Sequence, residues 1–383
     1  MKKTSIIMVV IIAVFIVTGF KNIQAEEIPI KIGAVFSISG SNAFLGEPEK
    51  NTAEMTVAKI NKQGGLLGRQ IELIVMDDES DVNKTILAMD RLIRKDKVVA
   101  VLGPTGTGNA LAVVHKMKNY GVPLISCAAA EKITTPTTPW VFKVAPSDRF
   151  AVIRILDHIL ANQGKKIAVL TASDGFGQAG RTVLAELIPE KGLELVADEV
   201  YGPKDSDMTP QLTKIASLNP DAIICWGTNP GPAVISRNRK QLGIEVPMYM
   251  SHGVASHKFI ELAGDSSEGL LLPAGRLVVA EKLPANDQQR ELLIDFKTGY
   301  ERDFKSDVST FAAHGIDAVM VTVKAIEMGQ SDEPEKIREN LEKISDLIGI
   351  YGIFNFSSEN HDGLDERAFI MVRIHNNDWE IVQ

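Results

Sequence analysis

Cysteine is scarce in this chain of 383 residues, which contains only Cys127 and Cys225. Each lies at the end of a predicted strand, and the two strands belong to different halves of the chain. This placement favours two buried free thiols over a disulfide. The chain must then be held together by hydrophobic cores, and its length allows about two domains.

An excess of positive charge is also lacking. The chain has 49 acidic and 41 basic residues, with a formal net charge of −8 at pH 7. Because nucleic acids and anionic membranes attract basic proteins, this balance argues against both as partners.

Long hydrophobic runs are absent after residues 1–25. That first segment has three lysines, of which Lys2 and Lys3 precede an apolar run over residues 6–17, and it has the small Ala25 at its end. This pattern predicts a secretory signal peptide cleaved near Ala25. The run is short for a membrane span of ~20 residues, and no cysteine follows it for lipid attachment. We therefore expect an exported, periplasmic protein without direct membrane insertion, whose net charge becomes more negative when the three lysines of the segment are removed.

Motifs for catalysis are missing as well. No nucleophile elbow, zinc-binding helix or pair of catalytic carboxylates is present. The histidines, such as His115 and His361, do not show metal-ligand spacing. The sequence therefore predicts no enzyme, no cofactor and no metal. An enzyme built from two α/β lobes around a cleft is the second hypothesis.

What the chain does have is a regular alternation of strands and helices, which predicts parallel sheets covered on both faces. A break at residues 145–147 divides it into two series, and residues 31–36 of the first resemble residues 166–171 of the second. The fold class predicted is α/β, with two similar doubly wound parallel-sheet lobes. The predicted strands are 30–36, 71–76, 98–102, 122–126, 141–144, 166–171, 193–200, 222–225, 248–250, 269–272, 352–356 and 368–374. The predicted helices are 48–61, 82–94, 109–118, 150–160, 178–188, 209–218, 233–242, 257–262, 287–304, 311–328 and 334–343.

One glycine-rich turn is the first candidate site. Residues 98–110 read as a buried strand, a turn with three glycines, and a helix start that Gly108 or Asn109 can cap. Thr105 and Thr107 add hydroxyl groups to the free N–H groups of the helix start. Such an end binds anions, and we expect a carboxylate there. The glycine pattern is neither a Walker A loop nor a dinucleotide fingerprint. The alternative is a strand-to-helix turn without a ligand.

Two aromatic residues follow equivalent strands in the two series. Phe44 precedes Gly46 in the first, and Phe176 precedes Gly177 in the second. Because open α/β sheets bind ligands at the carboxyl ends of their strands, the two rings can form opposing walls of one cleft. The alternative is that each ring packs locally.

An ordered set of short motifs resembles one family. The motifs lie at residues 60–73, 77–78, 103–104, 121–126, 174–177, 263–265 and 268–269. Together they resemble the type I periplasmic solute-binding proteins of branched-chain amino acid ABC transporters. Residues 311–318 further resemble a stretch of those members that take aromatic acids.

This resemblance implies two lobes joined by a three-crossover hinge, with the ligand between them. It places residues 26–145 and 275–353 in lobe 1, and residues 146–274 and 354–383 in lobe 2. It also implies a membrane permease of an ABC importer as partner, and we expect a monomer. A ligand sensor for a separate receptor is the alternative role.

The family's binding residues can be matched to positions of this chain. The carboxylate anchor corresponds to Thr107 with the backbone of its neighbours, and the aromatic walls to Phe44 and Phe176. Two positions depart from amino-acid binders. Ala130 replaces a hydroxyl residue, and His252 replaces the acid that pairs with the ligand's ammonium. The full candidate set is Phe44, Thr105, Gly106, Thr107, Ala128, Ala129, Ala130, Phe176, Trp226, Thr228, His252 and Phe311, with Asn229, Pro230 and His314 nearby.

A buried ammonium without a paired acid costs several kcal/mol. We therefore predict an aromatic or apolar monocarboxylate as the ligand, held by its carboxylate and by flat apolar walls. A branched-chain or other amino acid is the alternative.

Overall fold

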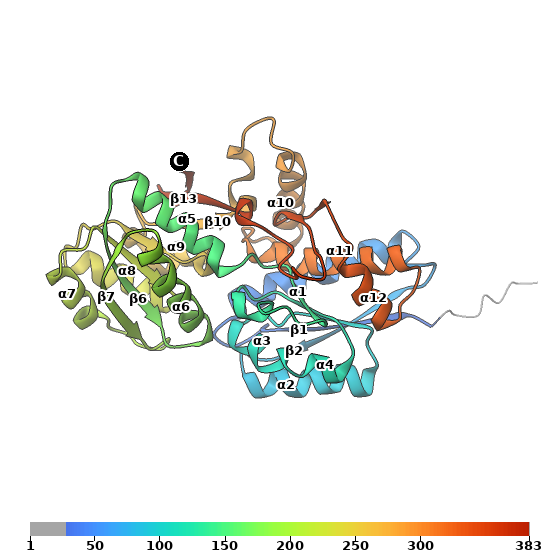
Figure 1. Ribbon diagram of the computed structural model, residues 1–383. Helices are drawn as coiled ribbons and strands as arrows, with labels where there is room; N and C mark the ends of the chain where they lie inside the picture. The colour runs from blue at the N-terminus through green and yellow to red at the C-terminus, as the bar shows by residue number, and fades with distance from the viewer. Residues whose placement is uncertain (1–27, 383) are drawn as a thin grey trace, which may run out of the picture.

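Two separate β-sheets organise the chain, one in each of two lobes (Figure 1). The computed structural model describes residues 28–382. The predicted signal peptide lies outside the described residues. The two-lobed α/β fold with parallel sheets is confirmed.

The first sheet has the strand order β2-β1-β3-β4-β5, and all its neighbouring strands are parallel. Apolar runs such as Ile30–Phe36 form strands buried on both faces, because helices cover the sheet on each side. The strands are β1 (Ile30–Phe36), β2 (Ile71–Asp77), β3 (Ala100–Leu102), β4 (Leu124–Ser126) and β5 (Val141–Lys143). The helices between them are α1 (Ala43–Lys62), α2 (Val82–Asp90), α3 (Thr107–Val114) and α4 (Met117–Tyr120).

The second sheet has the order β14-β13-β10-β9-β8-β6-β7. Its parallel part consists of β6 (Lys166–Ala172), β7 (Glu194–Tyr201), β8 (Ala222–Trp226), β9 (Met248–Met250) and β10 (Leu271–Gly275). Two antiparallel strands, β13 (Phe369–His375) and β14 (Asp378–Ile381), complete one edge. The helices are α5 (Asp148–Ala161), α6 (Gly175–Glu190), α7 (Thr209–Ser217), α8 (Gly231–Gln241) and α9 (His257–Ala263).

The chain between β10 and β13 is mostly helical. It lies mainly beside the first lobe (Figure 1). It forms α10 (Arg290–Phe304), α11 (Phe311–Gly329) and α12 (Pro334–Leu341), followed by the short paired strands β11 (Leu347–Ile348) and β12 (Ile353–Phe354). Helix α11 packs along α1, and the Thr52 hydroxyl donates to the Ala312 carbonyl at 2.8 Å.

Several predicted boundaries were wrong. Helix α1 begins at Ala43 rather than residue 48, so Pro48 lies inside it. A Cβ at Gly46 would lie 2.3 Å from the Ser37 carbonyl oxygen, so only glycine lets this first turn pack on the loop after β1. The predicted helix 109–118 is two helices, α3 and α4, and residues 352–356 form only the short strand β12, outside the second sheet.

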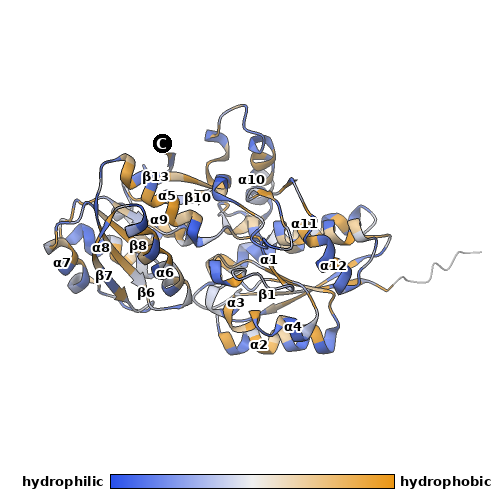
Figure 2. Cartoon of the chain, viewed as in Figure 1, coloured by the Kyte–Doolittle hydropathy of each residue, from blue (hydrophilic) through white to orange (hydrophobic). Residues whose placement is uncertain are grey.

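The helices combine polar and apolar faces, and the strands of both sheets are largely apolar (Figure 2). Both cysteines are free and buried, which confirms the prediction for Cys127 and Cys225. Within residues 28–382, none of the helices combines the length and hydrophobicity that crossing a bilayer requires.

Candidate functional site

A cavity of about 610 Å³ opens where the strands of both sheets end. Its walls come from the segments after β3 and β4 of the first sheet, and after β6, β8 and β9 of the second. Helices α1 and α11 and the segments after β1, β2 and β7 complete it. This is the position at which open α/β sheets bind ligands. We call this cavity the cleft.

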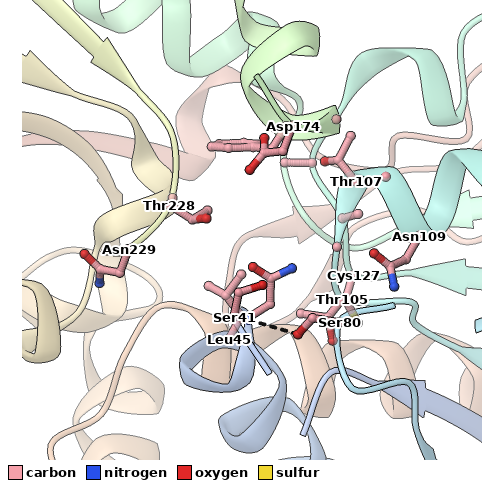
Figure 3. A pocket seen from close by; sticks show the side chains of 18 of the residues that line it. Ser41, Leu45, Ser80, Thr105, Thr107, Asn109, Cys127, Asp174, Thr228 and Asn229 are labelled. Carbon is pink, nitrogen blue, oxygen red and sulfur yellow. Dashed lines mark hydrogen bonds between the residues drawn. The ribbon is translucent and has the colours of Figure 1, made fainter. Parts of the chain in front are cut away.

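The close view shows how the polar side chains surround the cleft (Figure 3). Thr107 and Asp174 lie near each other at one side, at the starts of α3 and α6. Thr228 projects from the opposite wall toward the cavity, and Leu45 lies on α1 below it.

Two helix N-termini meet at the Thr107 side of the cleft. Helix α3 starts at Thr107, and α6 starts at Gly175 after Asp174, whose carboxylate accepts from the Gly177 amide at 2.8 Å. A Cβ on Gly175 would lie 2.8 Å from the Cα of Gly108, so only glycine lets the two helix starts approach this closely. The start of α3, which has no side-chain cap, carries partial positive charge that suits an anionic group, whereas the start of α6 is already capped by the Asp174 carboxylate.

The details of the glycine-rich turn differ from the prediction. The N-cap of α3 is Gly106 rather than Gly108 or Asn109, and Asn109 instead donates its amide to Asp78 at 2.9 Å and to Thr85 at 2.7 Å. Of the three glycines only Gly103 has positive φ, and it packs on β1. The glycine at position 103 is therefore required by packing against β1, whereas the later part of the turn lines the cleft.

The Thr105 hydroxyl is already engaged within the protein. It donates to Glu49 at 2.5 Å and accepts from the Ser37 amide at 3.1 Å. Thr105 still lines the cleft, but its hydroxyl serves to hold Glu49. Thr107, in the first turn of α3, therefore remains the better candidate for a ligand carboxylate.

Glu49 is a cleft residue that the sequence analysis missed. It is 1% exposed, lines the cleft, and lies 3.2 Å from the imidazole Nδ1 of His314. Burial raises the pKa of Glu49 well above its usual range. A signal was present, because Glu49 stands four residues before Ala53 on the buried face of α1.

His314 is placed beside Glu49 by the close packing of α11 on α1. Gly315 allows this approach, since a Cβ there would lie 2.0 Å from the Glu49 carbonyl oxygen. The His314 ring stacks on Tyr351 at 5.1 Å, and burial lowers the pKa of His314 to about 3. His314 is therefore neutral at physiological pH.

A second histidine lines the cleft from the other sheet. His252 follows β9, is 6% exposed, and contacts the rings of Phe176, Trp226 and Phe369. Its Nε2 lies 3.6 Å from a carboxylate oxygen of Asp148. Burial, aided by nearby His314 and then by the positive charge of Lys143, lowers the pKa of His252 to about 3.

Aromatic rings form part of the walls, but not all those predicted. Phe176 and Phe311 line the cleft. Phe44 packs edge-on behind Phe311 at 5.9 Å, and its neighbour Leu45 faces the cavity instead. Trp226 is fully buried behind Phe176, with ring centroids 5.6 Å apart.

The remaining predicted site residues also fall into two groups: those that line the cleft and those that are buried behind its walls. Ala128 and Ala129 line the cleft, as do Gly106, Thr107 and Thr228. Ala130 is fully buried and outside the lining, and its carbonyl faces the Lys143 ammonium at 3.4 Å. The structure thus gathers most of the predicted residues at one cavity and leaves Phe44, Ala130 and Trp226 behind its walls. Whether the lining residues contact a ligand stays a prediction.

Comparison with known proteins decides the family. The family model described as periplasmic binding protein matches residues 29–378. The chain belongs to the periplasmic binding protein family. Its type I architecture and its relation to binding proteins of branched-chain amino acid transporters are confirmed by the relatives that follow.

Two solved structures and one relative show how this binding protein compares. An extracellular ligand-binding receptor from Rhodopseudomonas palustris HaA2 is 28% identical, with a TM-score of 0.86 over 93% of this chain and 100% of that one. The branched-chain amino acid transporter substrate binding protein LivJ from Streptococcus pneumoniae, in complex with isoleucine, is 26% identical, with a TM-score of 0.81 over 92% and 99%. A leucine-, isoleucine-, valine-, threonine- and alanine-binding protein from Pseudomonas aeruginosa is 24% identical over 86% of each chain.

Proposed function

We propose that this binding protein captures a small aromatic or apolar monocarboxylate between its two lobes and delivers it to the membrane permease of an ABC importer. It acts as a monomer in the periplasm, and closing of the lobes around hinge crossings near residues 145, 275 and 354 buries the ligand.

The observation that carries the proposal is that one cleft combines a helix start suited to an anion with aromatic walls. The start of α3 brings Thr107 and its backbone N–H groups to the cleft, where they suit an incoming anion. Phe176 and Phe311 supply apolar walls for a flat body. This combination suits an acid whose remaining surface is apolar.

Recognition of an α-amino acid is less well supported. The residue at the family's ammonium position is His252, which is neutral because burial lowers its pKa to about 3. Ala130 offers no hydroxyl and lies outside the cleft lining. A neutral imidazole compensates a buried ammonium less well than a carboxylate does.

Glu49 and Asp174 favour the second candidate, an amino-acid binding protein, because both acids line the cleft. However, each is already engaged. Glu49 accepts from Thr105, and Asp174 caps α6. Burial also raises the pKa of Glu49, which favours its neutral form.

The test is a thermal-shift screen of the mature protein with two panels, followed by calorimetry on each hit. One panel holds branched-chain amino acids, and the other holds aromatic and apolar acids without an amino group. We expect a rise in melting temperature with the second panel only. A rise with the amino acids alone would refute the proposed ligand class and support the second candidate.

A further inference from the structure

The candidate anion site of the cleft lies beside an acid, which leaves a charge to be balanced. Thr107 and Asp174 are near each other at one side of the cavity (Figure 3). The Asp174 carboxylate is held in place as the cap of α6, because it accepts from the Gly177 amide at 2.8 Å. Burial raises the pKa of Glu49, the other acid of the lining, and so favours its neutral form. A ligand carboxylate at Thr107 is therefore repelled by Asp174 unless a cation compensates it.

One residue of the cleft can supply this positive charge. Within residues 28–382 the lining contains no arginine and a single lysine, Lys204, which is exposed. The two histidines of the lining, His252 and His314, are neutral at physiological pH, because burial lowers the pKa of each to about 3. Lys204 is therefore the cation of the cleft.

Lys204 is presented by a tight turn that directly follows β7. The Asp205 amide donates to the Gly202 carbonyl at 2.9 Å, and the Asp205 carboxylate accepts from the Gly202 amide at 2.7 Å. Pro203 and Lys204 are thus the two central residues of the turn, and proline favours the first of these positions. The backbone that carries Lys204 is fixed by these bonds.

The same turn lies beside the start of α6. Strands β6 and β7 are parallel neighbours, and Ala172 is opposite Tyr201 at their ends. The Ser173 amide, one residue beyond β6, donates to the Tyr201 carbonyl at 2.9 Å. Asp174 and Lys204 therefore follow adjacent strand ends of one lobe, and both line the cleft.

The acids close to Lys204 in the sequence are already engaged. Lys204 takes no part in the salt bridges found among residues 28–382, whereas Lys214 of the same lobe pairs with Glu199 at 2.6 Å. The carboxylate of Asp205 closes its own turn, and that of Asp207 accepts from a backbone amide at 2.9 Å. The Lys204 ammonium is thus available to an anion that enters the cleft.

The acidic stretch around Ser80 in the first lobe is engaged in the same way. Asp77 accepts from the Ser39 hydroxyl at 2.7 Å, and Glu79 pairs with Lys84 at 2.5 Å. Because these acids have partners within their own lobe, they do not require an ion pair across the cleft.

We propose that Lys204 is the counter-charge for the ligand carboxylate, which offsets Asp174 beside the Thr107 anchor and thereby makes the cleft select acids. The inference rests on the proposed function and adds a specificity-determining residue to it. The flexible four-carbon stem of lysine lets the ammonium follow the carboxylate as the lobes close. A local cation also attracts anions to a chain whose formal net charge is −8.

The experiment measures the affinity of parent and variant for acids by calorimetry at two salt concentrations. The probes are benzoate, phenylacetate and 3-phenylpropionate, so that three ligand lengths are sampled. At low salt, Lys204→Met should weaken binding of these acids about fivefold, as expected for the loss of one accessible ion pair. Raising the salt from ~20 to ~500 mM should reduce the difference to about twofold or less, because salt screens the charge. Equal affinities of parent and variant at low salt would overturn the inference.

Two further variants separate the local charge from other effects. Lys204→Arg keeps the charge and should bind the acids within about twofold of the parent. Lys214→Met is the matched control, because it removes the same charge from an exposed position on α7 outside the cleft lining, and it should also stay within about twofold. A loss in either variant as large as that in Lys204→Met would overturn the inference. Melting curves verify folding, and Lys204→Gln replaces Lys204→Met if the latter is unstable.

The balance with Asp174 is tested by a double-mutant cycle. Asparagine is itself a good helix N-cap, so Asp174→Asn removes the charge but keeps the start of α6. Asp174→Asn should strengthen acid binding about threefold or more in the Lys204→Met background and less in the parent, where Lys204 already offsets the carboxylate. The same effect in both backgrounds, or no recovery, would contradict the charge balance.

The parent protein distinguishes failure of this inference from failure of the proposed function. If neither panel of the thermal-shift screen binds, the proposed function is refuted and the role of Lys204 with it. If only branched-chain amino acids bind, the proposed ligand class is refuted, and the same variants measured with isoleucine decide the role of Lys204. If the acids bind and Lys204→Met binds them equally well, only the role of Lys204 is refuted.

Discussion

Replacing Asp148 with asparagine should stabilise the protein at neutral and alkaline pH and have a smaller effect in acid. Asp148 is the first residue of α5, is fully buried, and neither carboxylate oxygen has a hydrogen-bond partner among residues 28–382. Burial raises its pKa from 3.8 to about 7, although Lys143 nearby opposes the shift. The negative charges of Glu131 and Asp362 act in the same direction as burial.

The direction in which stability changes with pH follows from the number of protons bound by the folded and unfolded states. Between pH 3.8 and about 7 the folded protein keeps a proton that the unfolded chain has lost, so the stability of the parent falls as the pH rises through this interval. Each pKa unit corresponds to ~1.4 kcal/mol. Between pH 4.5 and pH 8 this single group therefore removes about 3 kcal/mol from the free energy of unfolding. Asparagine does not ionise and avoids this loss.

The assay is urea unfolding of parent and variant at several pH values from 4.5 to 8. The advantage of Asp148→Asn over the parent should grow by about 3 kcal/mol over this range and then level off above pH 8. Asp157→Asn is the matched control, because Asp157 lies on the same helix but is half exposed. A constant difference between Asp148→Asn and the parent at all pH values would show that the buried carboxyl group is not the source of the pH dependence.

Four other predictions concern the cleft and the core. Thr107→Val should weaken ligand binding tenfold or more by calorimetry while the melting temperature stays close to that of the parent, and unchanged affinity would count against this anchor. His252→Glu should shift the preference toward amino acids in the thermal-shift screen, and the assignment fails if binding of the acids is retained and no amino acid is gained. Gly315→Ala should lower the free energy of unfolding by roughly 2 kcal/mol or more, because its Cβ would meet the Glu49 backbone; a smaller loss in urea unfolding would contradict the packing of α11 on α1. Cys127 and Cys225 should react with a thiol reagent only after unfolding, since burial raises the pKa of both thiols, and rapid labelling of the folded protein would disprove their burial.

The sequence by itself determined the layered α/β fold. Apolar, β-branched runs such as those of β1 and β6 are periodic, local signals, and each is followed by a turn and an amphipathic helix. The glycine-rich turn after β3 was equally visible, because a strand, glycines and a helix start follow one another directly in the chain. These features depend on neighbours within a few residues, so they could be predicted without knowledge of the packing.

Helix boundaries were predicted less well, because distant contacts decide them. Helix α1 begins five residues before Pro48 since Gly46 packs on the loop after β1. The antiparallel strand β14 was not predicted, because its four residues, which alternate polar and apolar, are too few to give a local signal and pairing with β13 decides the strand.

Only the tertiary structure decided which side chains face the cleft. Leu45 rather than its neighbour Phe44 lines it, because one residue along a helix turns the side chain by about 100°. The pairs Glu49–His314 and Asp148–His252 join residues more than one hundred positions apart, and no local pattern links them. The chain therefore encodes its sheets locally, whereas the chemistry of the cleft arises from long-range packing of α11 on α1 and of α5 against the end of β9.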